Sequence, residues 1–335
     1  MKLLKIALTL AAATLMTACG SLGTAPTPPQ QLRVNIFPGG FNWPIWAGQE
    51  QGFFARNGVD VTTIDTPSSR EQLVGLINGQ FEIGMTAIDN LLAYREGQGA
   101  VPIDGSNLIA VMGADNGFLR LGVQSNIKTF ADLKGSTVSV DALTTGYAFV
   151  LLEVLERNGL VLDRDYKTVA AGGVLQRYNA LVEGKHAATM LIAPFDVLGK
   201  EKGISVLADA SAALGSYQGL VAGVRKTWAD NNKPALVGYI RGYRSALDWL
   251  YDPKNKEAAL AIFIKNVKGA TRQSAETSYG ILLDPKNGFT RDAAISVEGS
   301  RTAVQLREKY GQPQKKMQPL ESYIDTSYHK EASGR

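Results

Sequence analysis

The sequence predicts an α/β protein built from two similar lobes. Segments with strand alternation and segments with helical periodicity follow one another from about residue 32, which is typical of sheets covered by helices on both faces. The same features then recur with one offset of 105 residues, which indicates one supersecondary unit used twice. The alternative is coincidence, because Asn-Gly and L-x-x-G helix ends are common in α/β proteins. The recurring pairs are Leu76 and Leu181, Gly79 and Gly184, and Met85 and Met190.

The chain begins with an export signal. Lys2 and Lys5 precede an apolar run of residues 6–16, which small residues and Cys19 follow. The run is too short to remain as a membrane-spanning helix. We therefore expect residues 1–18 to form a signal peptide and residues 19–31, rich in Pro, Thr and Gly, to form a flexible tether.

The elements of the first lobe can be placed in order. "LRVNIFP", from Leu32, alternates as a strand, and a helix that contains Trp46 and Phe53 then runs to the stop at Asn57-Gly58. "GVDVTTI" is the second strand. A capping pattern with Ser68 and Glu71 then starts a helix, and "FEIGM" is the third strand.

The second lobe repeats this order. The strands "TVSV", "YKTVAA" and "AATMLIAP" follow, and a helix that ends in "LVEG" lies before the last of them. "YQGLVAGVR" is a later strand, and from Pro234 the segment "ALVGYIRGYRSALDWLYD" has helical spacing.

Composition and motifs exclude several functional classes. The net charge is +4, and Lys2 and Lys5 supply two of those charges, so the rest of the chain is nearer +2. This is too little to predict nucleic-acid binding, since no basic run with interleaved aromatics occurs. The only cysteine is Cys19, and neither His186 nor His329 stands in a catalytic or metal-binding motif. We expect no enzyme activity, no cofactor and no metal site.

The order of these features resembles a known family. "AGQEQGFFARNGVDV", "SSREQLVGLINGQFEIGMT", "DLKGSTVSVD" and "AATMLIAP" resemble the solute-binding proteins of bacterial ABC importers for nitrate, taurine and aliphatic sulfonates, a group that includes the NMT1/THI5-like proteins binding thiamine-precursor pyrimidines. The resemblance covers residues 32–270. It implies a type II periplasmic-binding fold, in which the first lobe holds residues 32–118 and the second holds residues 119–217. Residues 218–335 would supply a return strand and C-terminal helices, and the hinge segments would lie near "LRLGV" and "YQGLVAG".

The residues before Cys19 resemble the lipobox of bacterial lipoproteins, although Met16 stands where Leu is usual. In that family the cysteine becomes the first mature residue and carries the lipids. The resemblance thus implies a monomeric lipoprotein on the periplasmic or extracytoplasmic face of the cell envelope. It would capture a solute in the inter-lobe cleft and deliver it to an ABC permease with its ATPase.

Two other functions remain open. One is a pyrimidine-synthesis enzyme, but those relatives use a cysteine-rich iron-binding segment and an active-site histidine that this chain lacks. The other is a receptor subunit that feeds a sensor. The solute is also open, with candidates among thiamine-type pyrimidines or other heteroaromatics, alkyl or aryl sulfonates, and aromatic carboxylates.

The expected ligand contacts follow from the rule that ligands bind at the carboxyl ends of strands in open α/β sheets. Helix N-termini there suit anions, and loop aromatics such as Trp43 can stack on a planar ligand. The acids favour a ligand with hydrogen-bond donors or positive charge over a bare anion. We expect Trp43 to lie in the loop before the Pro44 helix. The predicted ligand-binding residues are Phe41, Asn42, Trp43, Ser68, Ser69, Arg70, Asp89, Asn90, Asp115, Asp141, Thr144, Thr145, Gly146 and Asp196.

Overall fold

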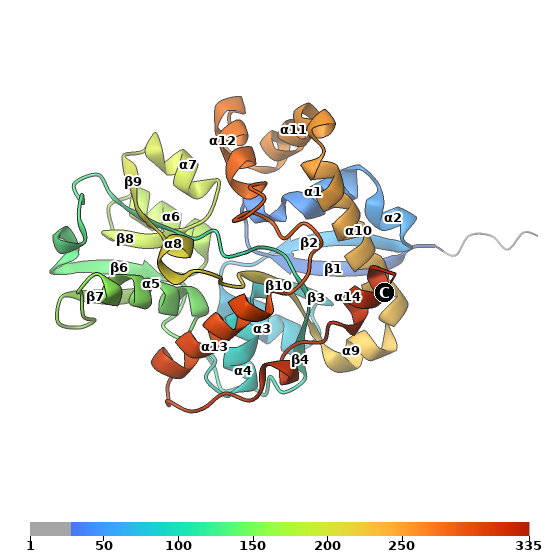
Figure 1. Ribbon diagram of the computed structural model, residues 1–335, viewed down its shortest axis with the longest axis horizontal. Coiled ribbons are helices and arrows are strands. Elements are labelled where there is room, and N and C mark those ends of the chain that lie inside the picture. The colour runs from blue at the N-terminus through green and yellow to red at the C-terminus, as the bar shows by residue number, and fades with distance from the viewer. Residues whose placement is uncertain (1–27, 335) are drawn as a thin grey trace, which may run out of the picture.

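The computed structural model describes residues 28–334, which form two α/β lobes side by side with a C-terminal set of helices around the first (Figure 1). The predicted signal peptide, Cys19 and most of the predicted tether lie outside the described residues. Within residues 28–334, no helix has both the length and the apolar character that crossing a bilayer requires.

The first lobe is built on a five-stranded sheet of order β2-β1-β3-β10-β4. β1 pairs in parallel with β2 and β3, whereas β10 returns from late in the chain and runs antiparallel to both β3 and β4. β1 begins two residues before the expected Leu32, because the N–H of Gln30 already donates to the carbonyl of Gly58. The strands are β1 (Gln30–Ile36), β2 (Val59–Asp65), β3 (Ile83–Ala87), β4 (Leu108–Gly113) and β10 (Leu220–Arg225).

The second lobe has a sheet of the same design, in the order β7-β6-β8-β5-β9. Position for position, β6, β7 and β8 match β1, β2 and β3, and the antiparallel β5 takes the place of β10. The predicted use of one unit twice is therefore confirmed, as are the two α/β lobes. The strands are β5 (Arg120–Gln124), β6 (Ser136–Val140), β7 (Tyr166–Ala170), β8 (Ala188–Leu191) and β9 (Ile204–Asp209).

Helices of the two lobes also correspond. α3 (Ser69–Ile77) and α6 (Val174–Val182) lie at the repeat offset, and the Ser68 hydroxyl caps α3 by accepting from the N–H of Glu71 at 3.2 Å. The helix predicted up to Asn57 is in fact two helices, because Gly52 has a positive φ of 68° that stops the first. The others are α1 (Trp43–Glu50), α2 (Phe53–Arg56), α4 (Ile88–Arg95), α5 (Gly146–Arg157), α7 (Phe195–Lys200) and α8 (Ala210–Leu214).

The C-terminal third is helical, as predicted. The apolar stripe of α10 is buried against α1 and α2. α13 packs on α4 of the first lobe and on α5 of the second, so that it bridges the two (Figure 1). These helices are α9 (Lys226–Asn231), α10 (Lys233–Tyr251), α11 (Lys256–Asn266), α12 (Arg272–Leu282), α13 (Val297–Tyr310) and α14 (Ser327–Ala332).

Candidate functional site

A cavity of about 40 Å³ lies between the lobes. This volume has room for about three water molecules. Both lobes and the start of the return strand β10 contribute to its wall, which is mainly hydrophobic with a few polar groups. The lining residues are Phe37, Phe41, Ala87, Asn90, Asp141, Thr145, Tyr147, Val174, Arg177, Ile192 and Leu220.

The repeated fold explains why these residues meet. Phe37 directly follows β1, and Asp141 directly follows β6, its counterpart in the second lobe. Ala87 and Ile192 stand at the ends of the equivalent strands β3 and β8 in the same way. Because parallel strands present their carboxyl ends at one edge of a sheet, the two lobes bring these two edges together around one cavity.

The lobes touch across the cleft. The N–H of Gly173, at the start of α6, donates to the carbonyl of Pro67 at 2.7 Å, and the N–H of Gly40 donates to the carbonyl of Ala193 at 3.1 Å. Each bond joins the first lobe to the second. The arrangement is therefore a closed one, in which the cavity is surrounded by both lobes.

Arg177 supplies the cation of the cavity. It is only 3% exposed, and its guanidinium donates to the hydroxyl of Thr189 and to the carbonyls of Gly172 and Met190 at 2.8–3.2 Å. Burial lowers its pKa, while the nearby carboxylate of Asp141 acts in the opposite direction. The sequence-based list missed Arg177.

Asp141 supplies the anion. The backbone N–H of Ser69, at the start of α3 in the other lobe, donates to its carboxylate at 3.0 Å. Burial raises the pKa of Asp141, and the charge of Arg177 and the bond from Ser69 partly offset this effect. A carboxylate at the N-terminus of a helix is stabilised by the helix dipole, so this contact also favours closure.

Four of the predicted ligand-binding residues line the cavity: Phe41, Asn90, Asp141 and Thr145. The amide of Asn90 donates to the hydroxyl of Thr86 at 3.0 Å, and the hydroxyl of Thr145 donates to the carbonyl of Ala142 at 2.9 Å. Both polar side chains are thus held in place by residues of their own lobe.

Trp43 is a correction to the sequence prediction. It begins α1 rather than lying in the loop, and it is fully buried away from the cavity. Its indole N–H donates to the carbonyl of Ala259 at 3.1 Å, and its ring packs against Phe263 and Tyr279. Helices of the C-terminal third cover this side of the loop, so the tryptophan belongs to the core.

Three further predicted residues serve lobe-to-lobe contact instead of the cavity wall. The carboxylate of Asp89 pairs with Arg307 of α13, and the same guanidinium donates to the backbone carbonyl of Thr144 at 2.6 Å. Gly146 lies so close to Asp89 that an added Cβ would stand 2.4 Å from the Cβ of Asp89. None of the three lines the cavity.

The other predicted acids also have hydrogen-bond partners within the fold. Asp115, in the segment that leads to the second lobe, accepts the N–H groups of Gly117 and Leu220 at 2.7 and 3.1 Å. Burial raises its pKa to about 6, although these two bonds act against the shift. Asp196 accepts from Arg120 at 2.8 Å. Neither of them lines the cavity.

The remaining predicted residues lie around the site. Ser68 caps α3, Ser69 contributes its backbone N–H to Asp141, and Arg70 is exposed on the surface. Asn42 is buried, donates to the carbonyls of Phe37 and Gly39, and lines a separate groove of about 400 Å³. Its own side chain therefore shapes the loop that carries Phe41.

The family model described as NMT1/THI5 like matches residues 42–256. The chain belongs to the NMT1/THI5-like family. This match spans both lobes and reaches the C-terminal helices. None of the curated proteins matches the sequence significantly.

Several solved structures share the fold of this NMT1/THI5-like protein. The alkanesulfonate-binding protein SsuA from Xanthomonas axonopodis pv. citri, bound to MOPS, has a TM-score of 0.72 and 17% identity over 90% of this chain and 100% of that chain. The nitrate-binding protein NrtA from Synechocystis PCC 6803 has a TM-score of 0.72 and 12% identity, over 91% and 89% of the two chains. The zinc-bound ligand-binding component of an ABC-type import system from Staphylococcus aureus has a TM-score of 0.73 and 14% identity, over 91% and 100%. The chain thus has the periplasmic-binding fold.

Proposed function

We propose that this protein is the substrate-binding lipoprotein of an ABC importer. It captures a small organic solute between its lobes at the cell envelope and delivers it to a membrane permease, whose separate ATPase supplies the energy. The family membership supports this role, and so does the description of structurally similar proteins as binding components.

The single observation that carries the proposal is the cavity between the lobes. Loops of both lobes line it, and backbone hydrogen bonds join the lobes around it. A ligand that contacts both lobes shifts a hinged protein toward its closed state, because those contacts exist only there.

A binding role also agrees with the positions of the two histidines. His186 lies in the turn before β8, at the opposite end of that strand from the cavity, and the ring of His329 lies 2.7 Å from the carbonyl of Asp292 in the C-terminal segment. Residues 28–334 contain no group of acidic, histidine or cysteine side chains that could hold a metal ion. These features support capture of the solute over its conversion.

Small-angle scattering of the lipid-free protein tests capture. A thermal-shift screen of heteroaromatics, sulfonates and aromatic carboxylates first identifies a tight ligand, since binding to the folded state raises the midpoint of unfolding. The radius of gyration should then fall on addition of that ligand. If a tight ligand left the radius of gyration of the open, ligand-free protein unchanged, the proposal would be contradicted.

The anchor on Cys19 is tested separately. In cells, Cys19→Ser should release the protein from the membrane fraction, whereas Ser21→Ala, two residues away, should leave it there. Lipid labelling of the Cys19→Ser protein would refute the anchor without touching the role of the cleft.

A further inference from the structure

The internal repeat gives Arg177 a counterpart in the first lobe. Gln72 stands 105 residues earlier, at the same place on α3. Its amide donates to the carbonyl of Met85, as the guanidinium of Arg177 donates to the carbonyl of Met190, which is the equivalent residue of β8. A neutral side chain is therefore sufficient to hold the central strand to this helix. The positive charge at position 177 is not required by the fold.

The guanidinium also has unused donors. It carries five N–H groups, and three of them bond to Thr189, Gly172 and Met190. A buried cation ordinarily has a carboxylate partner. Asp141 is the carboxylate that acts on Arg177, yet the two form no ion pair within 4.0 Å in the described part of the chain.

The position of the cavity explains why Arg177 and Asp141 form no ion pair. Arg177 and Asp141 both line it, one from α6 and one from the loop after β6, and hydrophobic side chains such as Phe37, Phe41 and Val174 form most of the remaining wall. A group placed between them meets N–H donors on one side and carboxylate acceptors on the other. The two charges cancel, so the site is neutral as a whole.

We propose that the site selects an uncharged solute whose polar edge carries a hydrogen-bond acceptor beside a donor, as in a carboxamide, lactam or imide. The acceptor lies toward Arg177, the donor toward Asp141, and the hydrophobic body of the solute against the aromatic wall. This inference rests on the proposed solute-binding function and names the class of solute.

Charged solutes are disfavoured by the same geometry. A carboxylate or sulfonate that pairs with Arg177 would bring its charge close to Asp141, and a cation that pairs with Asp141 would approach Arg177. Like charges that share one small cavity repel strongly, because little water is present to screen them. Selection against charged solutes depends on this repulsion as much as on the attractive contacts with the preferred solute.

Calorimetry with three probes of one shape tests the class: acetamide, acetate and acetamidinium, at neutral pH, each small enough for a cavity of about 40 Å³. The wild-type protein should bind acetamide at least about tenfold more tightly than either charged probe, a difference of about 1.4 kcal/mol. Asp141→Asn should reverse the preference toward acetate, because the repelling charge is gone. Arg177→Gln should weaken acetamide binding about tenfold and improve the relative affinity for acetamidinium.

Arg177→Gln recreates the side chain found at Gln72, so the variant should fold, and an unchanged midpoint of thermal unfolding checks this. The matched control is Arg301→Gln, which changes an exposed arginine of α13 outside the cavity and should leave all three affinities unchanged. A wild-type preference for acetate, an unaltered ratio in Asp141→Asn, or binding of none of the three would overturn the inference. Compaction with a solute of another class would leave the proposed function intact.

Discussion

Arg307 and Asp89 form an ion pair that is closed off from solvent, with side-chain exposures of 0% and 1%. The Nε of Arg307 lies 2.7 Å from Oδ1 of Asp89 on α4, and its Nη2 donates to the carbonyl of Thr144 in the second lobe. One side chain of the C-terminal helix α13 thus contacts both lobes. The pair holds the lobes together at a point outside the cavity wall.

Loss of this arginine should be costly. Arg307→Met leaves the carboxylate of Asp89 buried without a partner, and breaking a buried pair in this way costs about 3–5 kcal/mol of unfolding free energy. Urea denaturation measures it, with Arg301→Met as the control, because Arg301 is an exposed arginine of the same helix. The double variant Arg307→Met/Asp89→Leu should recover most of the loss. An Arg307→Met protein as stable as the wild type would show that the pair contributes nothing.

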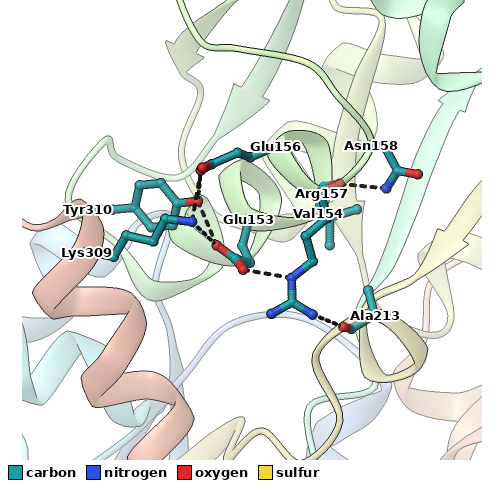
Figure 2. A network of polar contacts seen from close by, with 8 residues as sticks. All are labelled: Glu153, Val154, Glu156, Arg157, Asn158, Ala213, Lys309 and Tyr310. Carbon is teal, nitrogen blue, oxygen red and sulfur yellow. Dashed lines mark hydrogen bonds and ion pairs between the residues drawn. The ribbon is translucent and has the colours of Figure 1, made fainter.

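The contact between α13 and α5 predicts a pH dependence. Figure 2 shows the carboxylate of Glu153 with Lys309, Tyr310 and Arg157 around it, each with a donor 2.7 Å away. Burial alone would raise the pKa of Glu153, but these bonds outweigh it and lower the pKa to about 2. Because the pKa is lower in the folded state, the stabilisation is present above the unfolded pKa near 4.5 and is lost as the pH falls toward 2.

Glu153→Gln should therefore lower stability at pH 7 by about 1–2 kcal/mol and flatten the decline between about pH 4.5 and 2. Urea unfolding at a series of pH values gives both quantities. Glu183→Gln, in an exposed pair with Lys185, is the control and should leave the curve unchanged. If the Glu153→Gln curve fell as steeply as that of the wild type, the network would not be the cause.

The lack of a side chain at Gly146 should be necessary for the two lobes to close. A Cβ at this position would lie 2.4 Å from the Cβ of Asp89 in the opposite lobe, so Gly146→Ala can fit only if the lobes move apart. We expect a larger radius of gyration and a ligand affinity weakened about tenfold or more, while each lobe stays folded. Gly280→Ala is the control, since nothing lies within 4 Å of its Cβ position. Unchanged scattering and affinity in Gly146→Ala would contradict this role.

Trp43 should act on stability. Its ring is fully buried against Phe263 and Tyr279, so Trp43→Ala is expected to cost about 3–5 kcal/mol in urea unfolding. Phe53→Ala, at a partly exposed position on α2, should cost clearly less. A Trp43→Ala protein with wild-type stability and selectively weakened solute binding would contradict the placement of Trp43 in the core.

The difference between Phe41 and Trp43 shows what limits prediction from sequence. Both follow β1, and the rule that ligands lie at the carboxyl ends of strands selects both. In the structure Phe41 lies within a short 3-10 turn, Gly40–Asn42, and lines the cavity, whereas Trp43 directly follows this turn and packs into the core against α11 and α12. The partners that decide this are more than two hundred residues away along the chain.

The predicted acids show the same limit. The sequence indicates that acids follow several strands, but it does not say which of them have cationic partners within the fold. Asp89 has Arg307, which is 218 residues away, and Asp196 has Arg120. Among the predicted acids, only Asp141 lines the cavity, and it has no ion pair with any residue of 28–334. The repeat offset pairs Arg177 with Gln72, so the sequence could have drawn attention to this arginine. The sequence could not have shown that Arg177 is buried.

The amino-acid sequence by itself determined the alternation of strands and helices, the repeat of one unit, and the loops at which a site would form. These features depend on periodicity and on residues close in the chain, so they can be predicted from short stretches of the sequence. Only the tertiary structure decided which loop residues face the cavity and that Arg177 and Asp141 do so together. That choice depends on contacts between distant segments, because a side chain turns toward whichever partner the folded chain brings within a few ångströms.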